Sequence, residues 1–162
     1  MTNSFLRSSA MAAALAVGIG AAASLAYAHG GAQGVTKERM ELMKGMGDAM
    51  KVMAAMFKQQ APYQAEVVAE KAALLAEHAP KIPDLTPEGS NEKPSEALPI
   101  IWEDWDTFVE QTNRLEVESS KLAEIASNGG DEREVKIQFV KVSKSCGVCH
   151  ERFRKPKEDQ QS

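Results

Sequence analysis

The chain has 162 residues, of which 43% are hydrophobic and 26% are charged, and this size and composition predict one globular domain. Its formal net charge is −4. A mildly acidic chain lacks the basic surface that contacts the phosphates of nucleic acids, so a nucleic-acid-binding function is excluded. On charge alone, basic proteins are the favoured partners.

The first 28 residues have the pattern of a secretion signal. A short segment with one positive charge, Arg7, precedes an apolar run from Met11 to Ala26, and Ala26-Tyr27-Ala28 provides the small residues of a cleavage site. The alternative is a membrane anchor, but a spanning helix needs roughly 20 apolar residues and this run is shorter. We therefore expect cleavage after Ala28, export to the periplasm, and a mature domain of residues 29–162.

Removal of this segment makes the chain slightly more acidic. Lys plus Arg falls from 19 to 18 while Asp plus Glu stays at 23, so the net charge becomes −5. No later segment approaches the length of a membrane span.

Two helices are predicted in the first half of the mature domain. The first runs from Thr36, the expected N-cap, to Gln59, with large apolar residues recurring at steps of three and four. These residues are Met43, Met46, Met50, Met53 and Phe57. The second helix follows Pro62, which suits a first helical turn, and ends near His78.

A long connection and a third helix follow. Lys81 to Leu98 is rich in proline, shows no helix or strand pattern, and is expected to cross one end of a bundle. The third helix begins near Pro99 and ends at Asn128-Gly129-Gly130, which has the composition of a left-handed C-terminal cap. Its apolar stripe consists of Ile101, Trp105, Phe108, Thr112, Leu115, Ser119, Leu122 and Ala126.

The fourth helix is predicted from Asp131, an expected N-cap, to a point before Pro156. Its stripe consists of Val135, Phe139, Val142, Cys146, Cys149 and Phe153. Four amphipathic helices with short first and last connections predict an all-α, antiparallel four-helix bundle with a long loop between the second and third helices.

The fourth helix carries the motif Cys146-Gly147-Val148-Cys149-His150, which has the C-x-x-C-H spacing of covalent haem attachment. Residues three or four apart share one face of a helix, so Cys146, Cys149 and His150 can meet a single porphyrin. The thiols would form thioethers with its vinyl groups, and the imidazole would bind the iron.

Two other interpretations of this motif are weaker. A thiol–disulfide redox pair also has C-x-x-C spacing, but it usually opens a helix after a strand. A zinc site needs about four ligands, and the sequence has no second cysteine pair.

Several segments together resemble the class II c-type cytochromes, the cytochrome c′ family. They are Arg39–Gly47, Ala61-Pro62-Tyr63, Ile101-Trp102, and Cys146 to His150 followed by Glu151-Arg152-Phe153-Arg154. The resemblance covers the whole mature domain. It implies one haem c lying near one end of the bundle, between the first and last helices.

The resemblance assigns further residues to the haem. Met43 falls at the first-helix position that supplies the sixth iron ligand in the low-spin branch of the family, and Met46 and Met50 are alternatives on the same face. Arg39 matches a family arginine that approaches a haem propionate, and Arg154 is a similar candidate. Met43 is otherwise a packing residue, since methionine often fills gaps in cores.

Other histidines and aromatic residues are weaker candidates. His78 is interpreted as an exposed helix-end residue rather than an axial ligand, and His29 as a chance N-terminal histidine rather than a copper site. Trp102 and Phe153 are expected to pack near the haem.

The low-spin branch is thought to carry electrons, and this is the function we expect, with unidentified redox proteins as partners. The alternative is a five-coordinate, high-spin cytochrome c′ that binds NO or CO. An enzyme is not expected, because the sequence contains no distal acid–base pair of the peroxidase kind. The resemblance also implies a possible homodimer through the first two helices.

Overall fold

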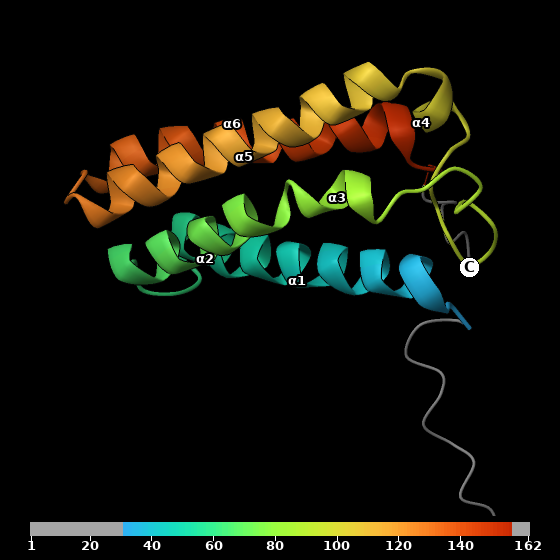
Figure 1. Cartoon of the computed structure of the whole chain (residues 1–162). Helices are drawn as coiled ribbons and strands as arrows, with labels where there is room; N and C mark the ends of the chain where they lie inside the picture. The colour runs from blue at the N-terminus through green and yellow to red at the C-terminus, as the bar shows by residue number, and fades with distance from the viewer. Residues whose placement is uncertain (1–30, 157–162) are drawn as a thin grey trace, which may run out of the picture.

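The computed structural model describes residues 31–156, so the expected secretion signal and the cleavage after Ala28 lie outside it. The described chain is helical, and four long helices form a bundle (Figure 1). These are α1 (Gly34–Phe57), α2 (Ala65–His78), α5 (Trp105–Ser127) and α6 (Glu132–Phe153). Two one-turn helices, α3 (Lys81–Asp84) and α4 (Ile100–Glu103), lie in the long connection.

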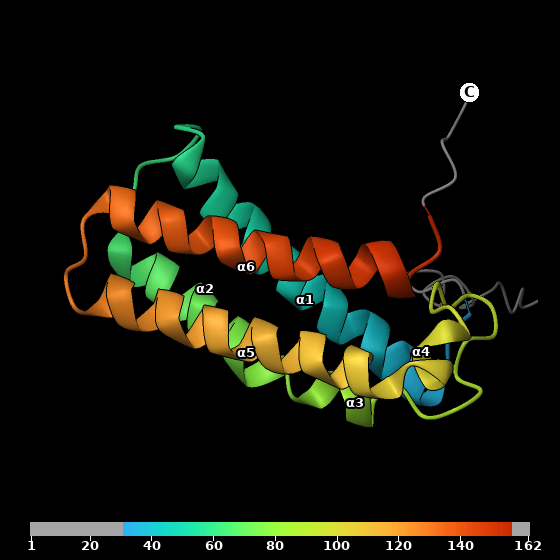
Figure 2. The ribbon, with the colours of Figure 1, turned by 90° about the horizontal axis from the view of Figure 1, so that it is seen from above.

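The helices pack as two antiparallel pairs, α1 with α2 and α5 with α6, which lie in two layers (Figure 1). The layers are joined mainly through α2 and α5. Seen from above, α6 passes over α1 at an angle (Figure 2), and these two helices are not among the closely packed pairs of the described chain. The predicted four-helix bundle is therefore confirmed, with its most open side between α1 and α6.

The predicted apolar stripes form the core. On α4 and α5 every stripe residue except the half-buried Trp105 is buried. On α1 the stripe alternates, because Met46, Met53 and Phe57 are buried while Met43 and Met50 are only partly covered. Met43, Met46 and Met50 all line the cavities described below.

The turn between α5 and α6 is the predicted one. Gly129 has a positive φ of 79°, and the Gly130 amide donates to the Ile125 carbonyl over 3.0 Å, as in a Schellman cap. The Asp131 side chain accepts a hydrogen bond of 2.8 Å from the Glu134 amide, which confirms it as the N-cap of α6.

The predicted N-cap of the first helix is wrong, and the third predicted helix, which starts at Pro99 as expected, is interrupted. The helix α1 begins at Gly34 with Gln33 at the N-cap, so Thr36 lies inside the helix, and its hydroxyl reaches the Ser90 carbonyl at 3.5 Å. The third predicted helix is two helices, because Asp104 leaves helical geometry with φ −129° and ψ 48° between α4 and α5.

The segment from Lys81 to Leu98 is also not free of helix, as the sequence suggested, since its first four residues form α3. Pro80 precedes this turn with φ −68°, and Ile82 within it is buried. A four-residue helix is too short to show a 3.6-residue period. The rest of the segment crosses the end of the bundle near α4 and the end of α6, as predicted (Figure 1).

No helix within residues 31–156 combines the length and the apolar character that crossing a bilayer would demand.

Candidate functional site

A cavity of about 430 Å³ opens between α1 and the C-terminal half of α6. The long connection, including α3 and residues 94–97, provides another of its walls. Its volume falls within the usual range of cofactor and small-molecule sites, roughly 300–1,000 Å³.

A smaller cavity of about 120 Å³ adjoins the first. The two cavities share five lining residues, namely Met43, Gly47, Ile82, Cys149 and His150. Cys146, Met46 and Met50 line the smaller cavity only. The two cavities therefore form a continuous site that extends from the bundle interior to its end.

The three residues of the C-x-x-C-H motif and the three further residues Met43, Arg39 and Arg154 all line this site. Arg39 and Arg154 line the larger cavity, Cys146 lines the smaller one, and Met43, Cys149 and His150 line both. Helix α1 thus contributes Arg39 and Met43, and the end of α6 contributes the others. The fold brings together residues that are about a hundred positions apart in the sequence.

The two cysteines are half-buried free thiols. Burial raises the pKa of Cys146, and burial together with the neighbouring Cys146 raises the pKa of Cys149 to about 11. Both groups are therefore protonated thiols at neutral pH. A redox-active C-x-x-C pair needs a thiolate of lowered pKa, so this environment disfavours the thiol–disulfide interpretation.

The zinc interpretation also lacks support. Within residues 31–156, no three side chains of the types His, Cys, Asp and Glu are grouped so that they could hold a metal ion. A structural zinc site needs about four such ligands.

Arg39 is a buried cation whose partners are all neutral. Its side chain is 7% exposed and donates four hydrogen bonds. The acceptors are the carbonyls of Leu85 and Ser90 and the hydroxyls of Ser90 and Ser95, at 2.6–2.9 Å. Burial lowers the pKa of Arg39. Because Arg39 makes no ion pair with a carboxylate in the described chain, an anion in the cavity would compensate its charge.

Arg154 also has spare hydrogen-bonding capacity. Its Nε atom is buried and has no hydrogen-bond partner among the described residues, and the Glu96 carboxylate is 3.8 Å away. The backbone beside it is fixed, because the Leu98 amide donates to the Phe153 carbonyl and the Lys155 amide donates to the Glu96 carbonyl. A buried donor without an acceptor is costly, so this atom also favours a polar or anionic group in the cavity.

Gly47 leaves open space on the α1 side of the site. Gly47 lines both cavities, and a Cβ atom built on it would meet no heavy atom within 4 Å. Gly45 is equally open but lines neither cavity. The absence of a side chain at Gly47 thus lets a flat group lie directly against the helix.

The remaining candidates from the sequence occupy other positions. Phe153 lines the larger cavity, whereas Trp102 donates from its ring to the Thr86 carbonyl and lines neither cavity. His78, in the last turn of α2, also lines neither cavity. His29 lies outside the described residues.

Ser90, Ser95 and Ile82 were missed as parts of the site by sequence reasoning. The two serines hold Arg39, and Ile82 lines both cavities. The only sequence signal for them is their position in a long proline-rich connection, which does not indicate what the connection covers.

The sequence of this chain is similar to those of known proteins. The family model described as Cytochrome C′ matches residues 34–154. A cytochrome c-556 from Agrobacterium tumefaciens (strain II Chrys) is 34% identical over 121 residues, which cover 75% of this chain and 97% of that protein. A cytochrome c′ from Rhodopseudomonas palustris is 34% identical over 126 residues, covering 76% of this chain and 83% of the relative.

Solved structures agree with the sequence comparisons. A cytochrome c′ from Rhodopseudomonas palustris superposes with a TM-score of 0.73 at 31% identity, covering 78% of this chain and all of that one. A cytochrome c′ from Shewanella frigidimarina gives a TM-score of 0.71 at 25% identity, covering 75% of this chain and 94% of that one.

Proposed function

This chain belongs to the cytochrome c′ family, whose cofactor is haem c, and we propose that it is an exported electron carrier with His150 and Met43 as axial iron ligands. Haem c supplies an iron that is reversibly oxidised by one electron. The protein's part is to hold this group, to occupy both sides of the iron, and to keep water away from it.

Cys146 and Cys149 are the attachment residues, because they are the only two cysteines of the chain. Both are free thiols that line the site, one turn of α6 apart. His150, the next residue, lines both cavities and is the proposed proximal ligand. Attachment through two residues of one rigid helix holds the haem in a fixed orientation against α6 and prevents its dissociation.

The observation that carries the proposal is that Met43 and His150 line the same two cavities from different helices. A thioether is a suitable sixth ligand for haem iron, and His/Met ligation raises the reduction potential. Met46 and Met50 line only the smaller cavity, so Met43 is favoured over them.

Arg39 and Arg154 are the proposed partners of the haem propionates. Both line the larger cavity. Arg39 is a buried cation without a carboxylate partner in the described chain, and the Nε–H of Arg154, 3.8 Å from the Glu96 carboxylate, has no hydrogen-bond partner there. Guanidinium groups bind carboxylates through charge-assisted hydrogen bonds.

Binding of NO or CO is the second candidate function. It is favoured by the comparisons, since the solved structures cited above are cytochromes c′. A related structure is described as a nitric oxide complex of a mutant cytochrome c′ from Alcaligenes xylosoxidans. That structure is 26% identical to this chain. Gas binding would require Met43 to pack beside an open sixth position instead of ligating.

Optical spectra of the purified holoprotein distinguish the two functions. For His150/Met43 ligation we expect sharp, split visible bands in the reduced form and a weak red thioether-to-iron band in the oxidised form. A Met43→Ala variant should lose the red band, whereas Met46→Ala and Met50→Ala should keep it.

Broad high-spin bands in the unmodified protein, together with rapid CO binding to its reduced form, would overturn Met43 ligation and favour gas binding. Retention of the red band by Met43→Ala would instead assign the ligand to another methionine.

Export and assembly complete the proposal. We propose that the segment ending at Ala28 directs export to the periplasm, where haem c is attached, and N-terminal sequencing of the secreted protein tests this. A homodimer through α1 and α2 stays a prediction, for which sedimentation of the holoprotein is the measurement.

A further inference from the structure

Charge is distributed unevenly along the chain. Although the net charge is −4, the segment 135–156 holds six Lys and Arg residues and one carboxylate, Glu151. The cations are Lys136, Lys141, Lys144, Arg152, Arg154 and Lys155. The neighbouring helix α5 has the opposite balance, with five carboxylates and two cations. Over its full length, Glu132–Phe153, helix α6 holds five cations and three carboxylates, so its positive charge lies in the part after Glu134 and in the residues that follow the helix.

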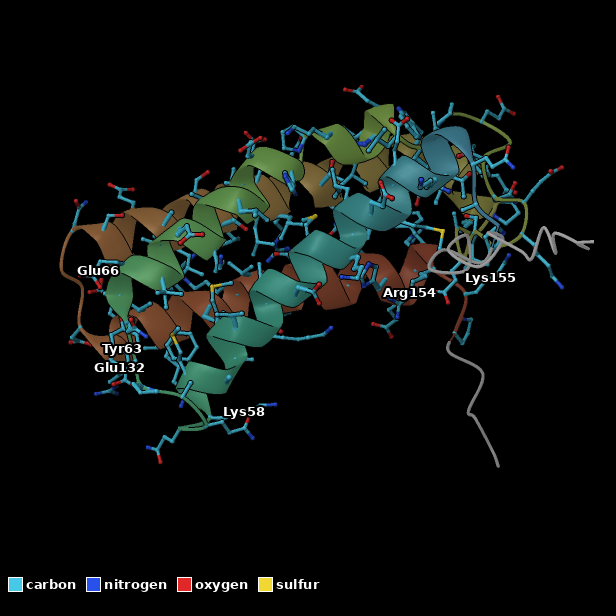
Figure 3. All side chains as sticks on the ribbon, turned by 90° about the horizontal axis from the view of Figure 1, so that it is seen from below. Lys58, Tyr63, Glu66, Glu132, Arg154 and Lys155 are labelled. Carbon is cyan, nitrogen blue, oxygen red and sulfur yellow. The ribbon has the colours of Figure 1, made fainter. Side chains whose placement is uncertain are left out.

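Carboxylates gather near the N-terminal end of α6. Burial and the carboxylates of Glu132, Glu66 and Asp131 raise the pKa of Tyr63. Tyr63 and Glu132 lie at one end of the bundle, and Arg154 and Lys155 lie at the opposite end, beside the haem cavity (Figure 3). Lys136 donates to the Phe57 carbonyl near Tyr63, and Arg152 is paired with Asp104. Lys141 and Lys144 are thus the exposed lysines closest in sequence to Cys146 and Cys149.

The side of α6 that faces solvent combines cations with exposed apolar residues. Ile137, Val140 and Val148 are 54%, 58% and 40% exposed. Together with Lys141 and Lys144 they recur at helical spacing on one side of α6, which we call the outer α6 face. The opposite side carries Val135, Val142 and Phe153, all buried, and the two cysteines.

The two central lysines of this face are available to a partner. Lys141 and Lys144 are exposed and make no ion pair within residues 31–156. By contrast, Lys44 and Lys51 are both paired with Asp48. Unpaired cations around a small apolar centre are the arrangement that attracts and orients an acidic surface.

We infer that the outer α6 face is the docking surface for an acidic electron-transfer protein, an inference that rests on the proposed electron-carrier function. A partner bound there would be separated from the cysteine side of α6 by about one helix diameter, roughly 10–12 Å. One electron would pass between the partner's redox centre and the haem iron, and no bond would form or break. The chain-wide charge favoured basic partners, but the local charge beside the haem favours acidic ones.

The same face is less suited to a membrane surface. Helices that lie in the bilayer interface present Trp, Phe or Leu to the lipid, whereas this face offers only Val and Ile. The aromatic residues of α6, Phe139 and Phe153, are packed against or inside the core of the bundle. The small exposed apolar area fits a transient protein complex.

The test measures reduction of the ferric holoprotein by reduced flavodoxin, an acidic one-electron donor, at low ionic strength. The test variant is the double variant Lys141→Glu/Lys144→Glu. The matched control, Arg114→Glu/Lys121→Glu, makes the same change in net charge on exposed, unpaired cations of α5.

We expect the α6 variant to lower the second-order rate constant about tenfold, and the α5 control to lower it about twofold through net charge alone. Salt at about 0.5 M should remove most of the difference, because exposed charges are screened. Equal losses in both variants would overturn the inference.

Further measurements distinguish failure of the docking inference from failure of the electron-carrier proposal. Amide chemical shifts that change on addition of flavodoxin should concentrate in Ile137–Val148, and changes centred elsewhere would overturn the inference. Binding of the wild type to phosphatidylglycerol vesicles that is lost in the α6 variant, with unchanged flavodoxin rates, would assign the face to membranes instead. A high-spin spectrum of the wild type would reject the electron-carrier function itself, independently of the ratio between variants.

Discussion

Arg39 and Ser90 lie 51 residues apart in the chain, yet the Arg39 guanidinium donates to the Ser90 hydroxyl over 2.7 Å and to the Ser90 carbonyl over 2.6 Å. Ser95 and the Leu85 carbonyl accept two more hydrogen bonds from the same group. One α1 side chain thereby holds the connection that forms a wall of the site. This relationship gives Arg39 a structural role in addition to its proposed contact with a propionate.

Replacement of Arg39 should loosen the connection. In Arg39→Ala the buried acceptors lose their charged donor, and we expect the free energy of unfolding of the holoprotein to fall by about 2–3 kcal/mol. Arg39→Lys should recover only part of this loss, because an ammonium group cannot reproduce the forked donors of the guanidinium. Urea unfolding measures the loss, and hydrogen exchange of residues 85–95 locates it.

Arg114 provides the control for this experiment, since it is an exposed arginine of α5 with no ion pair in the described chain. Arg114→Ala should change stability by less than about 0.5 kcal/mol. Equal effects of the two alanine variants, or unchanged exchange in the connection, would contradict the role of Arg39.

A side chain at Gly47 should obstruct haem attachment. Gly47→Leu would place an isobutyl group in the space shared by the two cavities, and overpacking of this kind costs about 1–3 kcal/mol. We therefore expect much less covalently bound haem per polypeptide, measured by the haemochrome absorbance of purified protein.

Gly45→Leu is the matched control, because it makes the same change two residues away, outside both cavities. Both variants gain helix propensity, roughly 0.8 kcal/mol relative to glycine, so a difference between them reports the cavity. Normal haem content in Gly47→Leu would show that the space beside this residue is not used.

Periodicity was sufficient to predict the core of the bundle. Residues such as Phe108 and Leu122 recur at heptad-like steps, and both are buried. The attachment motif was recognisable because its residues are adjacent in sequence and share one helix. These features depend on local spacing, which a sequence displays directly.

The contacts of the long connection were not predictable in this way. Nothing near Arg39 in the sequence indicates that Ser90 and Ser95 accept its hydrogen bonds, because the pairing depends on how the helices pack. The turn α3 is shorter than a periodic pattern. The total charge likewise concealed the cationic segment that ends with Lys155.

The end of α1 offers a stabilising substitution. Gln59 has a positive φ of 59°, and the Gln60 amide donates to the Ala55 carbonyl over 2.8 Å, as in a Schellman cap. A side chain is strained in this conformation, whereas glycine is not. We expect Gln59→Gly to raise the free energy of unfolding by about 0.5–1 kcal/mol.

Gln60→Gly is the comparison, since Gln60 is also exposed but does not have a positive φ. It should leave stability unchanged or lower it, because glycine there only adds freedom to the unfolded chain. Thermal and urea unfolding of both variants give the measurement, and a loss of stability in Gln59→Gly would contradict the strain at this position.

Asp48 should make stability depend on pH in acid. Hydrogen bonds from Lys44 and Lys51, at 2.8 and 2.9 Å, lower the pKa of the Asp48 carboxyl to about 2. A carboxyl whose pKa is lower in the folded than in the unfolded state stabilises the fold when it is ionised. Its contribution is complete above the unfolded pKa, near 4, and is lost as the pH falls through about 2.

Asp48→Asn should therefore be less stable than the wild type at neutral pH, and the difference should shrink at about pH 2.5. Salt should also reduce the difference, because all three groups are exposed to solvent and screened. Carboxyl NMR gives the pKa directly, and Lys44→Gln or Lys51→Gln should each raise it. A carboxyl that titrates near 4 in the wild type, with no response to either lysine variant, would show that these ion pairs do not persist in solution.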